Sequence, residues 1–255
     1  MKKYLWKNKK YEIISVFLIL ILWEIAAIKI NNEIYIPRIE EVLKSILSII
    51  QGQNFKWNLL SSIYRTVISF LSAYILAVIL GVLSLMYPVF KSFFKQINSV
   101  GKTIPTMVLV VLALVWFDKN KAPFVVGFAI VFPILYEGVV TALNNVDKNI
   151  MEMCKIYNVS TKEKIKKIYY PSIKFYTSGI FVSTFSLAFK VVVAGEVHGQ
   201  PKFGVGAAIQ LEKMNFNITG IFAWIILIAL MSIVLDKVNK VFLKRSDRWK
   251  DENRN

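Results

Sequence analysis

The sequence has few of the residues from which small catalytic and metal sites are built. Its 255 residues include one cysteine, Cys154, and one histidine, His198. A single cysteine cannot form a disulfide within the chain, and a single histidine cannot complete a cysteine–histidine metal cluster. A disulfide scaffold and a structural zinc site are therefore excluded. We also find no converging set of nucleophile, base and metal ligands of the kind an enzyme needs.

Charged residues are scarce as well, and acidic ones most of all. They make up 19% of the chain and hydrophobic residues 56%, against about 25% and about 45–50% in soluble domains. Lysine and arginine number 32 and aspartate and glutamate 16, which gives a formal net charge of +16. Such an excess of basic residues indicates contact with nucleic acid or with a membrane surface. The mean hydropathy of +0.53 favours the membrane.

Long apolar runs are what the chain has in abundance. An apolar helix needs roughly 20 residues to cross a bilayer, and we predict six such spans. They occupy residues 11–30, 62–86, 104–117, 122–143, 175–193 and 216–242. The third run is short for a crossing, and short or broken spans are common beside transport pathways. A signal peptide is the alternative for the first run because five lysines precede it, but no cleavage motif of small residues follows.

The positions of the basic residues test this topology, because cytoplasmic loops are enriched in lysine and arginine. With the N-terminus inside, and with the residues from Lys237 onward counted as the inner tail, 21 of the 32 lysines and arginines fall in inner segments and seven in outer ones. This bias supports a cytoplasmic location for both termini and explains the basic composition without nucleic acid. Residues 36–50 carry apolar side chains at helical spacing, so we expect an amphipathic helix on the outer membrane face.

The predicted fold is an all-α integral membrane protein with about six transmembrane helices. A basic cytoplasmic N-terminus (residues 1–10) precedes the first transmembrane helix (11–30). An extracytoplasmic amphipathic segment (31–61) leads to the transmembrane core (62–242), and a basic cytoplasmic tail (243–255) follows.

The loop between the fourth and fifth spans, residues 145–171, is predicted to fold as helix, turn and helix. Asp147 can cap a first short helix. The apolar face of that helix carries Ile150, Met153, Cys154 and Tyr157. Asn158 suits a left-handed turn, residues 160–163 form a capping box for a second helix, and Pro171 is expected to stop that helix. The loop is either a solvated basic connector or a protruding element that docks into a cytoplasmic partner. A DNA-reading helix pair tethered at both ends to a membrane could hardly lie along a duplex groove.

The spacing of this loop resembles the signature of the membrane subunit of binding-protein-dependent ABC importers. That signature is Glu-Ala-Ala, three residues, Gly, nine residues and Ile-x-Leu-Pro. Here Glu152-Met153-Cys154 stand for the triplet, Asn158 for the glycine and Ile168-Tyr169-Tyr170-Pro171 for the final element. The spacing fits without a gap, while several identities differ. Asparagine tolerates a positive φ better than most other residues, so the turn can persist.

Further stretches are similar to the branch of these importers that takes up sulfonates, taurine and nitrate. Residues 36–42 resemble the Pro-x-Pro-x-x-Val stretch of that branch. Residues 104–105 resemble its Ile-Pro-Pro start, and residues 114–117 resemble its Leu-Trp-Phe end. After the fifth span, Ala194-Gly195-Glu196 stand where the branch has Ala-Glu, and Gly204-Val205-Gly206 stand where it has Gly-Ile-Gly. The resemblance implies a small solute of this kind, and a vitamin precursor or another small organic molecule stays open.

The resemblance also implies the setting in which the chain works. It implies a multi-pass permease subunit of the bacterial plasma (inner) membrane that pairs with a second copy of itself around a translocation path. Two further partners are implied, an ABC ATPase subunit in the cytoplasm and an extracytoplasmic solute-binding lipoprotein or periplasmic protein. ATP and magnesium then bind to the ATPase, so this chain is expected to be no enzyme and to bind no cofactor itself.

Two sets of candidate site residues follow from the resemblance. The set for coupling to the ATPase is Glu152, Met153, Cys154, Tyr157, Asn158, Ile168 and Pro171. The set for the translocation path or the outer gate is Lys190, Glu196, Gly204 and Gly206. The two glycines are expected to permit a tight backbone turn.

Charged residues inside spans need a partner or a water path, because an ionisable group at a helix centre costs about 2.5–3.5 kcal/mol on insertion scales. Glu24, Glu137 and Lys190 lie deepest in the predicted spans, whereas Arg65 lies near the end of one and is expected to reach the interface. Lys190 can attract an anionic substrate, or it can pair with a glutamate between helices.

An ion-coupled secondary transporter is the alternative function. Such carriers are expected to show internal repeats with acidic residues at corresponding intramembrane positions, and we find no convincing repeat. Dependence on an added ATPase subunit separates the importer from this alternative and from a membrane-embedded enzyme.

Overall fold

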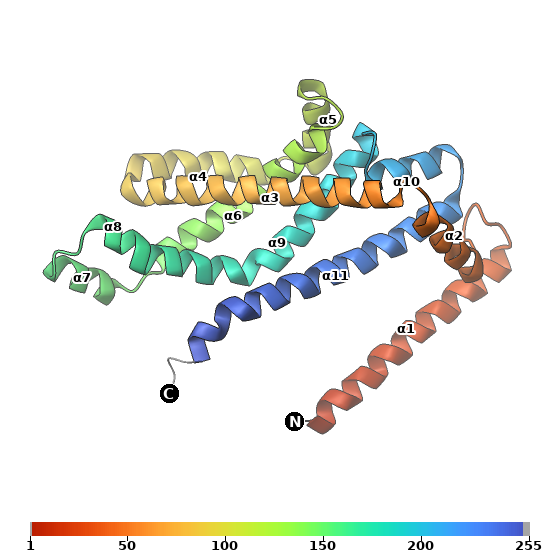
Figure 1. Ribbon diagram of the computed structural model, residues 1–255, viewed down its shortest axis with the longest axis horizontal. Coiled ribbons are helices and arrows are strands. Elements are labelled where there is room, and N and C mark those ends of the chain that lie inside the picture. Colours follow the sequence, from red (N-terminus) through yellow and green to blue (C-terminus); the bar gives the residue numbers. More distant parts are fainter. Residues whose placement is uncertain (1, 252–255) are drawn as a thin grey trace. The chain divides into compact units, whose positions relative to one another are not determined.

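The structure is a computed structural model that describes residues 2–251; for residues 2–10, 12, 13, 236 and 238–251 it describes the helical backbone alone. The regular structure in this part of the chain is entirely helical (Figure 1). The helices are α1 (Lys2–Ile30), α2 (Ile39–Gln51), α3 (Phe55–Met86), α4 (Pro88–Thr103), α5 (Thr106–Trp116), α6 (Ala122–Asn144), α7 (Lys148–Ile156), α8 (Thr161–Lys164), the π-helical turn η1 (Ile165–Tyr169), α9 (Tyr170–Gly199), α10 (Val205–Met214) and α11 (Ile218–Asp251).

The chain forms two compact units. The first comprises Met1–Lys56 with Ala208–Leu230, and the second comprises Trp57–Ala207 with Met231–Asn255. All candidate site residues predicted from the sequence lie in the second unit. Helix α1 begins at Lys2 and α3 begins at Phe55, ahead of the predicted spans 11–30 and 62–86. No proline or glycine interrupts either start, so both helices extend beyond their apolar runs.

In the first unit, two neighbouring residues of α1 hold the start of α2. Trp23 Nε1 donates to the carbonyl of Pro37 at 3.0 Å, and Glu24 Oε2 accepts from the amide of Ile39 at 3.1 Å. The N-cap residue of α2, Arg38, makes no side-chain cap bond. The deep glutamate predicted to need a partner therefore caps α2, since the first amides of a helix have no partner within it. The predicted amphipathic helix is confirmed as α2, whose Val42 is buried while Leu43 and Leu47 are exposed.

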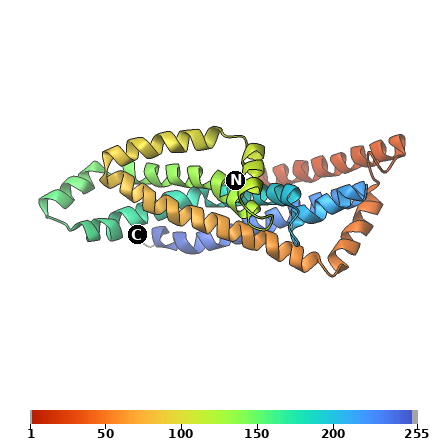
Figure 2. The ribbon, with the colours of Figure 1, turned by 90° about the horizontal axis from the view of Figure 1, so that it is seen from above.

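In the second unit, α6 and α9 lie against each other and form the centre of the core (Figures 1 and 2). Phe70 of α3, Leu135 and Val139 of α6, and Phe185 and Ala188 of α9 belong to one buried cluster. Phe70 meets Phe185 edge to face with ring centroids 5.4 Å apart. This packing fixes α3, α6 and α9 as the frame that positions the site.

Helix α3 presents small residues to this core. The buried ones are Ser62, Thr66, Ser69, Ala73, Ala77, Gly81 and Ser84. Small side chains let helices in a membrane approach closely. A Cβ added to Gly81 would lie 2.5 Å from Val139 Cγ1, so α3 and α6 meet at close range here.

The predicted number of six spans is not confirmed. Among the described residues, four helices are long and apolar enough to cross a membrane, and a bent pair raises the number to five. The four are Phe55–Met86, Ala122–Asn144, Thr161–Gly199 and Ile218–Leu235. The predicted first span, residues 11–30, lies in α1 and is not among them, and part of its side chains lies outside the described residues.

The bent pair includes the third predicted span, residues 104–117, which is short for a membrane crossing. Helices α4 and α5 meet at an angle of 101° around Ile104 and Pro105. Pro105 is the N-cap of α5. The bend prevents residues before Pro105 from extending α5, so the segment is a broken span or a re-entrant loop. Beside the bend, Lys102 at the end of α4 forms an ion pair with Glu137 of α6, which supplies the partner that this deep glutamate needed.

Candidate functional site

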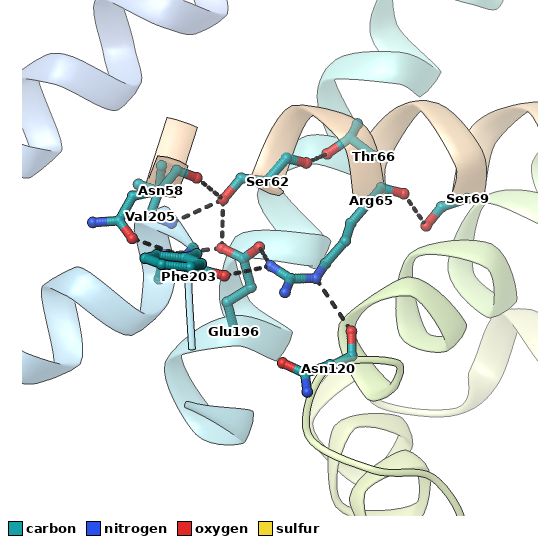
Figure 3. A network of polar contacts seen from close by, with 11 residues as sticks. Asn58, Ser62, Arg65, Thr66, Ser69, Asn120, Glu196, Phe203 and Val205 are labelled. Carbon is teal, nitrogen blue, oxygen red and sulfur yellow. Dashed lines mark hydrogen bonds and ion pairs between the residues drawn. The ribbon is translucent and has the colours of Figure 1, made fainter. Parts of the chain in front are cut away.

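An ion pair joins α3 to the end of α9. Arg65 Nη1 lies 2.6 Å from Glu196 Oε1, with 12% of the arginine side chain and none of the glutamate side chain exposed. Figure 3 shows the guanidinium reaching from α3 to the carboxylate. Removing one partner of a buried pair typically costs about 3–5 kcal/mol, because the other charge stays buried without compensation. The pair therefore fixes the relative position of the two helices.

Glu196 also holds the segment that follows α9. Its Oε2 accepts from the Ser62 hydroxyl at 2.7 Å and from the Gly206 amide at 3.0 Å. The Ser62 hydroxyl accepts in turn from the Val205 amide at 2.8 Å. Arg65 Nη1 donates to the carbonyl of Phe203 at 2.8 Å. Residues 203–206 are thereby fastened to α3 and α9 at once, as the dashed lines of Figure 3 show.

Gly204 and Gly206 are required because their backbone passes very close to Glu196. A Cβ added to Gly204 would lie 2.7 Å from the carboxyl carbon of Glu196, and one added to Gly206 would lie 2.7 Å from Glu196 Cβ and overlap the carbonyl oxygen of Val193. The tight turn predicted for them is not the reason, since neither glycine has a positive φ. A missing Cβ lets the backbone come within hydrogen-bond distance of a buried carboxylate.

Arg65 and Ser62 are site residues that the sequence analysis missed. Arg65 was expected to reach the membrane interface from the end of a span, but its Nη1 binds Glu196 and its Nε donates to the carbonyl of Asn120 at 3.2 Å. The arginine thus connects α3, α9 and the segment before α6. Arg65 and Glu196 are 131 positions apart, and no local pattern relates them. The only available signal was one basic and one acidic residue near the ends of two different spans.

At the other end of α9, the loop 145–171 is built by local capping. Asp147 Oδ1 accepts from the amide of Asn149 at 2.8 Å, which confirms the predicted cap of α7. Asn158 has a φ of 50°, its amide donates to Lys155 O at 3.2 Å, and the amide of Val159 donates to Cys154 O at 2.9 Å. These two bonds form a Schellman motif with asparagine in the left-handed position. The predicted turn at Asn158 is confirmed.

The loop exposes an apolar face and buries its cysteine. Met153 is 58% exposed and Tyr157 74%, and Ile150 and Ile156 are exposed as well. Cys154 is 7% exposed and therefore lies beneath the exposed face of α7. Glu152 is exposed too, on the charged side of α7. Exposed aromatic and methionine side chains on a short, doubly capped helix are a surface suited to a protein partner.

The second predicted helix begins as expected but does not end as expected. Ser160 caps α8 by accepting from the amide of Glu163 at 3.3 Å. The chain then continues through η1 into α9, so Pro171 does not stop it. A proline has no amide hydrogen and crowds the carbonyl four residues before it, and a π-helical turn widens the helix at that point. Ile168 lies half-buried in this turn. The loop is therefore continuous with α9, which carries Glu196 near its other end.

The remaining predicted site residue, Lys190, and the single histidine lie apart from these two sites. Lys190 is exposed on α9, one and a half turns before Glu196, and does not join the buried network. His198 is exposed, with its Nδ1 3.0 Å from the carbonyl of Ala194.

Comparison with known proteins decides the family. The family described as "Binding-protein-dependent transport system inner membrane component" matches residues 73–248. The chain belongs to this family. It is thus the permease subunit of a binding-protein-dependent ABC importer, and the prediction from the loop signature is confirmed at this level.

Related permeases cover most of the chain. A Methanocaldococcus jannaschii protein named as an ABC transporter permease is 27% identical over 227 residues, which are 86% of this chain and 84% of that protein. A probable ABC transporter permease protein of Brucella abortus is 20% identical over 227 residues, or 87% of this chain and 88% of that protein. A chain of the inward-facing MetNI methionine ABC transporter has the same fold, with a TM-score of 0.61 at 14% identity over 76% of this chain and 99% of that one.

The matched range divides the candidate sites of this permease. Residues 73–248 contain the loop 145–171, Lys190 and Glu196, whereas Ser62 and Arg65 precede the match. The carboxylate of the ion pair therefore lies within the part of the chain that the family describes, and the arginine that binds it lies outside.

Proposed function

We propose that this permease forms the translocation path for a small solute that an extracytoplasmic binding protein delivers, and that it is driven by an ABC ATPase which docks on α7. The observation that carries the proposal is the exposed apolar face of α7 on a loop rigidly capped at both ends. A second copy of the chain completes the path, and the assembly lies in the bacterial plasma membrane with both termini and α7 in the cytoplasm.

The coupling mechanism follows from the continuity of the loop with α9. Two capped helices transmit a displacement that a flexible loop would absorb. Closure of the ATPase subunits around ATP and magnesium moves α7, and η1 passes this movement to α9 because no break separates them. The spans then change between inward-open and outward-open packings, which is a population shift between discrete states.

The Glu196 network acts at the opposite end of α9. Helix α9 has 30 residues, which is about 45 Å of helix. The ion pair and the bonds to Val205 and Gly206 hold residues 203–206 in place when α9 moves. We assign this segment to the extracytoplasmic gate, where the binding protein releases its solute. Sulfonates, nitrate and taurine are the solutes that the resembling branch suggests.

The experiment that tests this function is ATP hydrolysis in lipid nanodiscs. The chain is purified with each candidate ABC ATPase, and binding proteins loaded with different solutes are added. Stimulation of hydrolysis by one loaded binding protein supports the importer and identifies its solute. Solute uptake by the chain without any ATPase would instead support the secondary transporter.

A further inference from the structure

Helix α9 differs from α3 and α5 in the face that it exposes. Through the middle of α3 the exposed aliphatic residues are Leu71, Ile75 and Ile79, and on α5 they are Val108, Val111 and Val115. Through the middle of α9 the exposed residues are Gly179, Ser183 and Lys190, while Phe185, Ala188 and Phe189 are buried in the core. A face that meets lipid is apolar, as those of α3 and α5 are. The α9 face has the opposite polarity, which is typical of a surface that meets water or a polar ligand.

A groove of about 530 Å³ follows this face. Its lining residues are Gly179, Val182, Ser183, Ser186, Leu187 and Lys190. They recur every three or four positions, so they form one line along the helix. Gly179 has open space in front of it, since an added Cβ would meet nothing within 4 Å. The groove therefore has room for a small molecule beside a single cationic side chain.

The deep glutamates that Lys190 could have paired with bind other groups. Glu24 caps α2, Glu137 pairs with Lys102, and Glu196 pairs with Arg65. Lys190 makes no ion pair with any residue in the described part of the chain. The described residues therefore do not show the pairing between helices that was the alternative for Lys190. An ammonium within a membrane-spanning helix needs a counterion or water, because lipid offers neither.

We propose that the α9 groove binds the anionic group of the transported solute and that Lys190 is the residue that attracts it. This inference rests on the proposed importer function and adds the class of solute, a small molecule with a carboxylate, sulfonate or phosphate group. The ammonium supplies a point charge with three donors, and the hydroxyl of Ser183 remains exposed while it donates to the carbonyl of Ile180 at 2.9 Å. One charge in an open groove holds an anion weakly enough to release it, which a translocation path requires.

Cysteine labelling in nanodiscs tests the proposal. The reporter is Ser186→Cys in a Cys154→Ser background, because Ser186 lies one turn before Lys190 on the same face. Two methanethiosulfonate reagents of similar size are compared, one carrying a sulfonate and the other a trimethylammonium group. We expect the anionic reagent to react about tenfold faster, as a local positive potential concentrates anions, and Lys190→Gln to abolish this preference. Ile79→Cys on the exposed aliphatic face of α3 is the matched control and should react with neither reagent.

Two results would overturn the proposal. Equal rates for the two reagents would show a wet groove without selectivity for anions, and absence of labelling at Ser186→Cys would show that lipid or a second copy covers the face. The labelling requires no ATPase, so its result tests the anion site separately from the proposed importer function. A chain that assembles with no ATPase contradicts the importer mechanism, whereas equal labelling rates contradict the anion site alone.

Discussion

Arg65 and Glu196 form a buried ion pair at 2.6 Å between the first span of the second unit and the end of α9. The same carboxylate binds the amide of Gly206, so one glutamate joins two spans to the segment that leaves the second of them. Disrupting this pair should therefore loosen the spans and the segment together.

Arg65→Met should destabilise the permease more than the matched double variant Arg65→Met with Glu196→Met. The single variant leaves Glu196 buried without a counterion, at a cost of about 3–5 kcal/mol, whereas the double variant removes both charges. Thermal unfolding of the purified variants in detergent shows which of the two is more stable. A double variant less stable than Arg65→Met would contradict the buried pair.

Gly206→Ala should prevent the segment 203–206 from closing on Glu196. The new Cβ would lie 2.7 Å from Glu196 Cβ and from the backbone nitrogen of Val197, and these atoms cannot move without shifting α9. We expect a large loss of folded protein by size-exclusion chromatography. Gly101→Ala is the control, because its Cβ meets only Pro133 Cγ at 3.4 Å and alanine favours a helix. Equal yields for the two variants would refute the close approach.

The left-handed residue of the loop should tolerate glycine but not a β-branched residue. Asn158 has a φ of 50°, a conformation that costs roughly 1–2 kcal/mol for an ordinary L-residue. Asn158→Gly should keep the amides of residues 158 and 159 protected from hydrogen exchange, and Asn158→Ile should speed their exchange several-fold. Unchanged protection in Asn158→Ile would mean that the turn does not depend on this conformation.

Exchanging the two charges of the ion pair between Lys102 and Glu137 should preserve their attraction. Glu137→Lys places two cations together where α4 meets α6, and adding Lys102→Glu restores an attractive pair. The coupling should amount to roughly 0.2–1 kcal/mol, since both side chains are partly exposed. A double-mutant cycle in thermal unfolding measures it, and simple additivity of the two changes would show that the pair contributes nothing.

An acidic residue on the exposed face of α7 should uncouple the ATPase from the permease, so that a loaded binding protein no longer stimulates ATP hydrolysis. Met153→Glu places a charge where the ATPase is proposed to dock, and it leaves the spans intact because Met153 is exposed. Lys155→Glu is the control, since it makes a larger change of charge on the opposite side of the same helix. Stimulation of hydrolysis by a loaded binding protein should be lost in the first variant and kept in the second. The reverse order would place the docking surface elsewhere.

Features set by neighbouring residues were predictable, and features set by distant ones were not. The caps at Asp147, Asn158 and Ser160 follow from short-range rules and are present. The stop at Pro171 also follows from such a rule, but the π-helical turn before it accommodates the proline. Cys154 has the right spacing for the exposed face, yet packing of the loop turns it inward. The pairing of Arg65 with Glu196 depends on how α3 and α9 meet, which no pattern in one sequence specifies.

Cross-linking from α7 tests the central claim most directly. A benzophenone maleimide is attached to Tyr157→Cys in the Cys154→Ser background, and the permease is illuminated in complex with its ABC ATPase. The account predicts a product that joins the permease to the ATPase subunit from Tyr157→Cys, and little or none from Lys155→Cys. A stable complex that yields no such product from Tyr157→Cys, or equal products from both positions, would contradict docking on the exposed face of α7.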